Sequence, residues 1–109
     1  MANTFKLKTK ANVGVTTVGI YTAPASTTTV VIGITLANTS GAGVNVGVGI
    51  TRAGATEDVK LLKNAPIPQG SSLEFMGVNK VVLEETDTVT VDSDANNSID
   101  ASLTIMEIT

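Results

Sequence analysis

Apolar residues occupy every second position in several stretches of this 109-residue chain. The clearest stretch is residues 28–38, where Val30, Ile32, Ile34 and Leu36 alternate with mostly small or polar side chains. A β-strand directs successive side chains to opposite faces, so this spacing describes a strand with one apolar face. No stretch has the spacing of an amphipathic helix with its caps. The two-residue period recurs in residues 44–50, 86–92 and 99–105. The sequence therefore predicts an all-β fold.

Turn-forming residues divide the chain at intervals of about 8 to 12 residues, which is typical of sandwiches and small barrels. We expect one domain over residues 1–109, folded as an antiparallel β-sandwich or a jelly-roll-like barrel of about eight strands. Residues 1–10 are expected to form either an arm or an edge strand. The expected strands lie at residues 4–10, 13–22, 28–38, 44–51, 58–63, 72–76, 80–83, 88–92 and 98–108.

Three connections between these strands have distinct signals. Small residues follow the strand at 28–38 and predict a hairpin with the strand at 44–51. Polar turn formers predict a second hairpin, between the strands at 88–92 and 98–108. Two prolines in residues 64–70 favour an extended segment, which we expect to cross between two sheets.

Gly47 and Gly49 leave one face of the strand at 44–51 without side chains. Glycine weakens a strand unless something packs closely against it or the strand is bulged. Two explanations stay open: a neighbouring subunit that lies flat on this face, and a bulged strand within one domain.

The chain contains no His, Cys or Trp. Without His, its Ser and Thr hydroxyls have no obvious base that would activate them as nucleophiles. Glu84 and Glu85 are neighbours in sequence, so we expect them to point in opposite directions rather than to share a substrate. The sequence therefore predicts no enzymatic activity, no catalytic residues and no cofactor.

The balance of charge is acidic, with seven Lys and Arg against ten Asp and Glu and a formal net charge of −3. Phosphate backbones and anionic lipids repel such a chain, so we expect neither nucleic acid nor a membrane as partner. Lys6, Lys8 and Lys10 share one face of the first strand, either as a solvated face that protects the edge or as a local basic patch. These lysines also interrupt any apolar signal-peptide segment, so we expect synthesis in the cytoplasm.

Asp92, Asp94 and Asn96 have the spacing of the first three oxygen ligands of a calcium-binding loop. The later positions do not fit, because Asn97 stands where the turn glycine belongs and Leu103 where the closing glutamate belongs. Two interpretations follow, an ordinary turn and a weak Ca²⁺ site, and the ordinary turn is favoured. We expect no metal as a functional ligand.

Four segments carry a resemblance to a known group: residues 20–24 (Ile-Tyr-Thr-Ala-Pro), 28–39, 62–74 and 98–108. They resemble small β-domain structural proteins of tailed bacteriophages, notably those that infect cyanobacteria. The resemblance implies a non-enzymatic virion protein. It implies a capsid decoration (cement) protein that binds the major capsid protein or another virion protein as a homo-oligomer, for which we expect a trimer.

Two other functions compete with this one. The chain could be a tail or fibre adhesion module that binds a host glycan, for which Tyr21 would be the ring available for stacking. It could also be a carbohydrate-binding or scaffold domain unrelated to phage.

Overall fold

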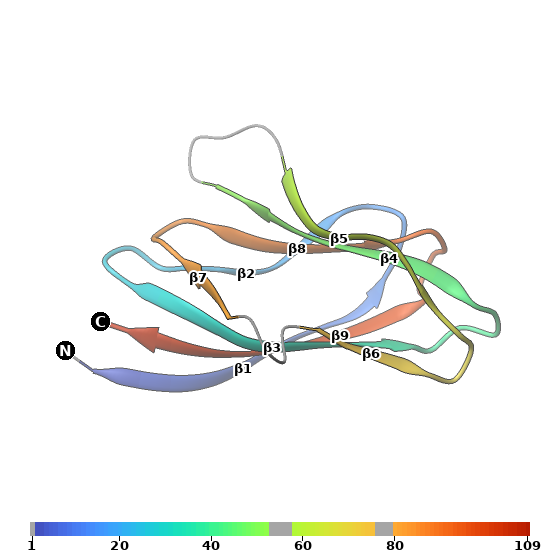
Figure 1. Cartoon of the computed structure of the whole chain (residues 1–109), viewed down its shortest axis with the longest axis horizontal. Helices are drawn as coiled ribbons and strands as arrows, with labels where there is room; N and C mark the ends of the chain where they lie inside the picture. The colour runs from blue at the N-terminus through green and yellow to red at the C-terminus, as the bar shows by residue number, and fades with distance from the viewer. Residues whose placement is uncertain (1, 53–57, 76–79) are drawn as a thin grey trace.

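The computed structural model describes residues 2–52, 58–75 and 80–109. This part of the chain contains nine strands in two antiparallel sheets that pack face to face (Figure 1). It has no helix, and so none that could cross a membrane. The predicted all-β sandwich is confirmed. Sheet A contains β1 (Asn3–Val13), β9 (Ile99–Ile108), β3 (Thr28–Asn38), β6 (Ser72–Phe75) and β7 (Val81–Leu83). Sheet B contains β2 (Val18–Thr22), β8 (Thr88–Ser93), β4 (Val44–Thr51) and β5 (Asp58–Ile67).

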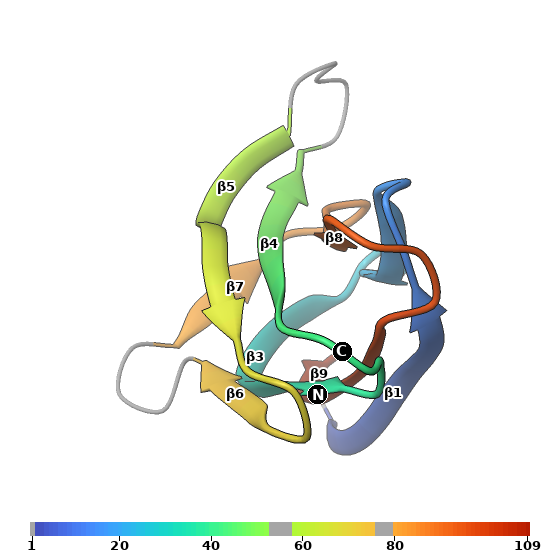
Figure 2. The ribbon, with the colours of Figure 1, turned by 90° about the vertical axis from the view of Figure 1, so that its right-hand side faces the viewer.

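The strand order is that of a jelly roll. Sheet A runs β1-β9-β3-β6, with β7 paired to another part of β3, and sheet B runs β2-β8-β4-β5. The chain changes sheet at most of its connections, while β4 and β5 are consecutive strands that pair with each other. Seen end-on, β1, β9 and β3 lie on one side and β4 and β8 on the other (Figure 2). Of the two predicted architectures, the jelly roll therefore describes the topology.

The core lies between the sheets and is aliphatic. Leu36, Leu103, Ile105 and Val48 are completely buried, and Tyr21 supplies an aromatic ring at one end. On β9 burial alternates residue by residue along the whole strand. Complete burial of such a side chain stabilises the fold by about 1.5–3 kcal/mol. The alternation of residues 99–105 is thus the pattern of an inward face. The alternation predicted for residues 30–36 is wrong in its first half, because an irregularity in the pairing between Val31 and Gly33 buries Val31 and leaves Val30 and Ile32 only partly buried.

Both predicted hairpins are wrong. β3 and β4 lie in different sheets, and so do β8 and β9. Each of these strands buries an apolar face, and the fold places the faces opposite each other across the core rather than side by side. A short loop therefore spans the gap between the sheets. After β3 the loop is held by the Asn38 amide, which donates to the carbonyl oxygens of Ala42 at 2.8 Å and Ile67 at 2.9 Å.

The crossing predicted from the prolines is present but shorter. β5 continues to Ile67, so Pro66 lies within a strand. Proline is tolerated there because β5 is an edge strand of sheet B. The chain then turns where Ser71 N donates to Pro68 O at 3.1 Å, and it enters β6 in sheet A.

Of the segment expected as an arm or an edge strand, residues 3–10 belong to an edge strand, and Met1 lies outside the described residues. β1 pairs with β9 from Asn3 opposite Ile108 to Lys10 opposite Ala101, so the two ends of the chain lie side by side (Figure 1). The strand expected at residues 13–22 is in fact divided between the end of β1 and β2. Met76, the last residue of another expected strand, lies outside the described residues.

Candidate functional site

The outer face of sheet B is a network of polar side chains, which we call the polar face. Its centre is Asp58, whose Oδ1 accepts hydrogen bonds from Thr51 Oγ1 at 3.1 Å and Thr90 Oγ1 at 2.9 Å. Lys60 Nζ lies 2.9 Å from Asp58 Oδ2 and 3.7 Å from Asp92 Oδ2. The network joins β8, β4 and β5. The complete polar face comprises Thr22, Thr51, Asp58, Lys60, Thr88, Thr90 and Asp92.

The glycines of β4 make room for these carboxylates. A Cβ atom at Gly49 would lie 2.5 Å from Asp58 Oδ2, and one at Gly47 would lie 2.5 Å from Asp92 Oδ1. The pairing of β4 with β5 is also irregular between Val46 and Gly49. Of the two explanations left open by the sequence, the structure therefore shows the bulged strand, covered by the chain's own side chains.

Ion pairing sets the protonation of this network. Burial tends to raise the pKa of Asp58, but hydrogen bonds from Lys60, Thr90 and Thr51 outweigh burial and lower it. The pKa of Lys60 is raised, chiefly by its hydrogen bond with Asp58. Both groups are therefore charged at neutral pH, and each stabilises the charge of the other.

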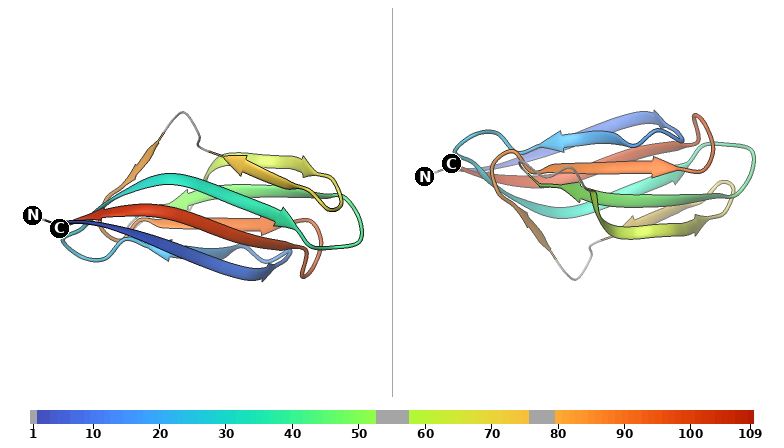
Figure 3. Two further views of the ribbon diagram at one scale, coloured as in Figure 1. Left: turned by 90° about the horizontal axis from the view of Figure 1, so that it is seen from below. Right: turned by 90° about the horizontal axis from the view of Figure 1, so that it is seen from above.

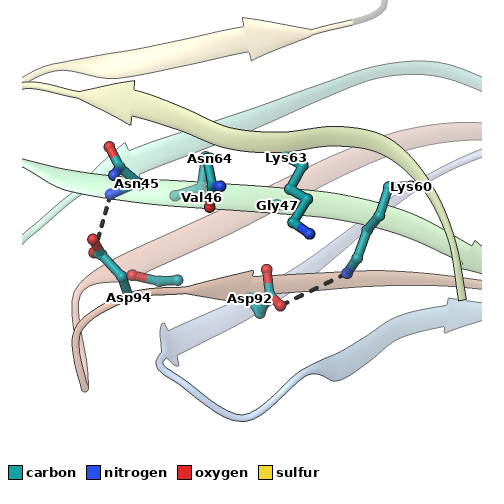
Figure 4. A pocket seen from close by; sticks show the side chains of 9 residues that line it. Asn45, Val46, Gly47, Lys60, Lys63, Asn64, Asp92 and Asp94 are labelled. Atoms are coloured by element: carbon teal, nitrogen blue, oxygen red, sulfur yellow. Dashed lines mark hydrogen bonds and ion pairs between the residues drawn. The ribbon is translucent and has the colours of Figure 1, made fainter.

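A shallow pocket of about 120 Å³ opens on the polar face beside Gly47 (Figure 4). Lys60, Lys63 and Asp92 line it together with Asn45, and Figure 4 shows the Lys60 amine directed at Asp92. Pockets for organic ligands usually enclose about 300–1,000 Å³ and are mostly apolar. This pocket is smaller and polar, so it does not have the features of such a site.

The residues of the calcium-loop motif are directed to different partners. Asp92 Oδ2 accepts from Thr17 Oγ1 at 3.1 Å, and Asp94 Oδ1 accepts from the backbone N of Asn45 at 3.0 Å. Asn96 is exposed in the loop that joins the two sheets. Within residues 2–52, 58–75 and 80–109, no three acidic, His or Cys side chains gather as a metal-binding group. The residues of the motif therefore belong to the end of β8 and to the loop that leads from β8 in sheet B to β9 in sheet A, and not to the predicted hairpin.

A buried polar cluster links the two sheets near the chain ends. Tyr21 of β2 donates its hydroxyl to Glu107 Oε2 at 2.6 Å and lies 2.8 Å from Thr29 Oγ1. Lys6 Nζ contacts Glu107 Oε1 at 2.8 Å. Burial, reinforced by the bond to Glu107, raises the pKa of Tyr21 to about 12. The Lys6 bond, with that of Tyr21, lowers the pKa of Glu107.

This cluster bears on two expectations from the sequence: that the ring of Tyr21 is available to stack a sugar, and that the lysines of β1 form either a solvated face or a basic patch. Tyr21 is 7% exposed, and Lys8 Nζ lies 6.0 Å from the centre of its ring, so Tyr21 offers no free face for stacking a sugar. The lysine face of β1 is not simply solvated either, because Lys6 points inward to Glu107. Charges directed inward at an edge strand are a known means of preventing edge pairing, which agrees with the protective role.

Glu84 and Glu85 bind different partners, although both line one open pocket together with Ser26, Thr27 and Thr28. Glu84 Oε1 pairs with Arg52 at 2.9 Å, whereas Glu85 Oε2 accepts from the backbone N of Ser26 at 2.8 Å. Arg52 also binds the buried Asp87 at 2.9 Å, and that bond is the main reason why its pKa is raised. The carboxylates of Glu84, Glu85 and Asp87 therefore bind other segments of the chain.

The outer face of sheet A is apolar near the chain ends, and we call it the apolar face. Phe5 is 69% exposed, Leu7 65% and Val82 59%. Register places Phe5 beside Met106, Met106 beside Val30, and Val30 beside Val82, in one row across four strands. The view from below looks onto β1, β9 and β3, and no other described segment crosses in front of them (Figure 3, left). The apolar face comprises Phe5, Leu7, Val30, Val82, Met106 and Ile108.

Sequence reasoning missed this surface. Apolar residues at every second position are normally interpreted as inward-facing. On β1 the relation is reversed, because Lys6 shares the inner side with Ile105 while Phe5 and Leu7 point outward. Alternation alone does not tell which of two faces is inside. The alternating lysines were the available signal, because Lys6 reaches the buried Glu107 with its side chain.

No protein-family model matches the chain, and no curated protein matches it. Among solved structures, its fold is similar to that of a protein from Bacillus endospore appendages, which form a novel family of disulfide-linked pili. The two share 18% sequence identity with a TM-score of 0.57, over 99% of this chain and 87% of the other. This likeness supports the β-sandwich fold.

Proposed function

We propose that the chain is a non-enzymatic structural protein of a phage virion, which decorates the capsid as a cement protein. The apolar face of sheet A is the observation that carries the proposal. Its three most exposed members, Phe5, Leu7 and Val82, contribute little to the core of the domain. Contiguous apolar side chains on a solvent-exposed surface favour a role in contacts between proteins.

The arrangement of polar groups supports the same role. No buried side-chain nitrogen or oxygen in the described part of the chain lacks a hydrogen-bond partner. The charged groups with shifted pKa values are bound to partners within the domain. The protein would then act through contacts of its surface with other proteins. Weak contacts that are repeated over a lattice add up to a large total affinity.

The phage setting is supported by the resemblance of residues 20–24, 28–39, 62–74 and 98–108. The fold is also shared with a protein of a different repetitive assembly, a pilus. That pilus is disulfide-linked, whereas this chain has no cysteine with which to form such a link. Glycan adhesion has less support, because Tyr21 is buried.

The experiment is an add-back to phage particles that lack the gene. Purified chain is added, and cryo-electron microscopy compares the particles with and without it. We expect new density distributed over the head and greater resistance of the head to heat. The variant Phe5→Thr/Leu7→Thr should lose this binding, and the matched control Val59→Thr, 59% exposed on sheet B, should keep it.

Other outcomes contradict the proposal in different ways. Density confined to the tail would support the adhesion alternative. Particles that never bind the chain and do not contain it after normal growth would show that it is not a virion component. Binding by the Phe5→Thr/Leu7→Thr variant at the level of the wild type would remove the apolar face from the mechanism.

A further inference from the structure

We propose that residues 2–10 are a detachable strand, which separates from β9 as a unit about a hinge at Asn12 while the rest of the sandwich stays folded. The closed form is the edge strand of Figure 1, and the open form is a free arm. The two structures that the sequence allows for this segment are then two states of one molecule. The inference goes beyond the capsid role and does not depend on it.

The first part of β1 contributes almost nothing to the core. Every residue from Asn3 to Asn12 is exposed except Lys8, which is partly buried. The two edge strands of sheet B differ in this respect, because β2 buries Tyr21 and β5 buries Ile67. A segment with few buried apolar contacts and exposed backbone hydrogen bonds opens at a lower free energy than the whole domain. Residues 3–10 are held chiefly by their backbone pairing with β9.

An irregularity in β1 supplies the hinge. Pairing with β9 is regular up to Lys10, but one extra residue of β1 lies before the next pair, at Val13. Asn12 in this stretch has a φ of 58°, in the left-handed region, and its backbone N donates to the Asp100 side chain at 3.0 Å. The regular ladder of hydrogen bonds therefore ends at Lys10.

The residues after the hinge are fixed to the rest of the fold. Val13 is 1% exposed, and its carbonyl oxygen accepts from Ser98 N at 3.0 Å. The carbonyl oxygen of Gly14 accepts from Ser93 N at 2.9 Å. Separation of the strand therefore stops before Val13, and β2 stays in place.

The ladder between the chain end and the hinge is continuous. All residues from Asn3 to Lys10 pair with β9 without a shift in register. At the end of the chain, Ala2 and Thr109 exchange two backbone hydrogen bonds, of 3.0 and 2.9 Å. Fraying from this end must first break both bonds, so the end is not a preferred starting point. We therefore expect the ladder to open in one cooperative step.

One ion pair connects this strand to the interior. Lys6 Nζ lies 2.8 Å from Glu107 Oε1, and the lysine side chain is 43% exposed. Opening breaks this pair, but Glu107 keeps the bond from the Tyr21 hydroxyl at 2.6 Å, and water reaches it from the side that β1 has left. The open state therefore buries no unpaired charge, which would otherwise make it costly.

Opening changes what the protein presents to its surroundings. The released segment carries Lys6, Lys8 and Lys10 together with Phe5 and Leu7. It is therefore a basic arm with apolar residues, in a chain whose net charge is −3. Opening also uncovers the backbone of β9, so that a second strand edge becomes free for pairing.

Hydrogen exchange of the full chain, measured residue by residue by NMR, tests this opening. β9 supplies an internal control, because its successive backbone amides point alternately to β1 and to β3. The β9 amides directed at β1 and the paired amides of residues 3–10, which we call the β1 amides, should share one rate. We expect that rate to be at least about 100-fold faster than that of the β9 amides directed at β3.

Two patterns of exchange would overturn the proposal. Protection that rises gradually from Asn3 to Lys10 would show fraying from the chain end instead of opening as a unit. One common rate for both sets of β9 amides would show that β1 separates only when the whole domain unfolds.

Variants separate this opening from unfolding of the domain. Val46→Ala removes core contacts on β4, which does not pair with β1. It should accelerate exchange of the β9 amides directed at β3 by at least about tenfold and leave the β1 amides unchanged. Equal acceleration of both sets would contradict an independent opening.

Lys6→Met tests the ion pair with Glu107. Loss of this pair should accelerate exchange of the β1 amides by about three- to tenfold. The matched control is Lys10→Met, because Lys10 lies on the same side of β1 and forms no ion pair with a described residue. It should leave the rate unchanged, and equal effects of the two variants would remove the ion pair from the closed state.

A reversible cross-link gives the last test. Phe5→Cys/Met106→Cys places two cysteines at directly paired positions of β1 and β9, in a chain with no other cysteine. Formation of the disulfide should slow exchange of the β1 amides by at least about tenfold, and reduction should restore it. The reduced form of the same variant is the control. Equal rates in the oxidised and reduced forms would show that exchange there needs no separation of the strands, and would overturn the proposal.

Discussion

The two outer faces of this sandwich are built in opposite ways. On sheet B, threonines and carboxylates bind one another above two glycines. Asp58, for example, binds three side chains, those of Thr51, Thr90 and Lys60. On sheet A, Phe5 and Leu7 project outward without a covering segment. The polar face is therefore complete within one chain, while the apolar face leaves hydrophobic surface in water.

The side chains of the polar face contribute to the stability of the domain, whereas the most exposed side chains of the apolar face contribute little to it. Replacing a side chain of the polar face disturbs several others, because they form one network. Replacing an exposed apolar side chain removes contacts that the isolated domain never made.

Gly49→Ala tests the polar face most severely. The new methyl group would lie 2.5 Å from Asp58 Oδ2, so the carboxylate must move away from Thr51, Thr90 and Lys60. Overpacking of this kind costs about 1–3 kcal/mol in the free energy of unfolding, and we expect the upper part of that range. Urea unfolding monitored by circular dichroism measures it.

The control is Gly41→Ala, because a Cβ atom there meets nothing within 4 Å. It should change the free energy of unfolding by less than about 0.5 kcal/mol. If the two variants were equally stable, the polar face would not be a tightly packed network.

Tyr21 tests the connection between the sheets that carry the two faces. Its pKa is about 12 in the folded chain against 10.0 ordinarily, so below pH 10 it is neutral in both states. As pH rises from 10 to 12 the unfolded chain ionises first, and the wild type loses up to about 2 kcal/mol of stability. Tyr21→Phe cannot ionise, so its deficit relative to the wild type should shrink over this interval. A constant difference in urea unfolding between pH 9 and 12 would contradict the raised pKa that burial and the bond to Glu107 give Tyr21.

Asp58 gives the corresponding test in acid. Its folded pKa lies below the ordinary value of 3.8, so its stabilising effect is complete above that pH and is lost as pH falls through the folded pKa. Asp58→Asn should be less stable than the wild type at pH 7 by about 1 kcal/mol. The difference should narrow as pH falls from 3.8 through the lowered folded pKa, because the wild type then loses the charge that binds Lys60. Thermal unfolding between pH 7 and strongly acidic pH measures this, and a difference that stays constant over the whole range would show that charge is not the cause.

The sequence predicts the sandwich because burial on strands such as β9 follows the alternation of their residues. It does not predict the irregularity in β3 between Val31 and Gly33, which buries Val31 in place of Val30 and Ile32. It does not predict which strands are neighbours, because a loop between sheets and a hairpin turn use the same small residues, as after Asn38. The glycines at 47 and 49 indicate a close approach, but the approaching groups, Asp92 and Asp58, come from the two neighbouring strands, β8 and β5. The pairing of β4 with β8, which is remote in sequence, leaves no local signal.

The smallest expected effect belongs to the apolar face in the isolated monomer. Leu7 is 65% exposed and lies beside Thr104, so its side chain gains little from folding. Leu7→Thr keeps a residue that is common in strands and should change the free energy of unfolding by less than about 0.5 kcal/mol. The measurement must be made at low micromolar concentration, where association between copies does not stabilise the wild type. A loss well above that limit would mean that the face stabilises its own domain, and the contrast between the two faces would then disappear.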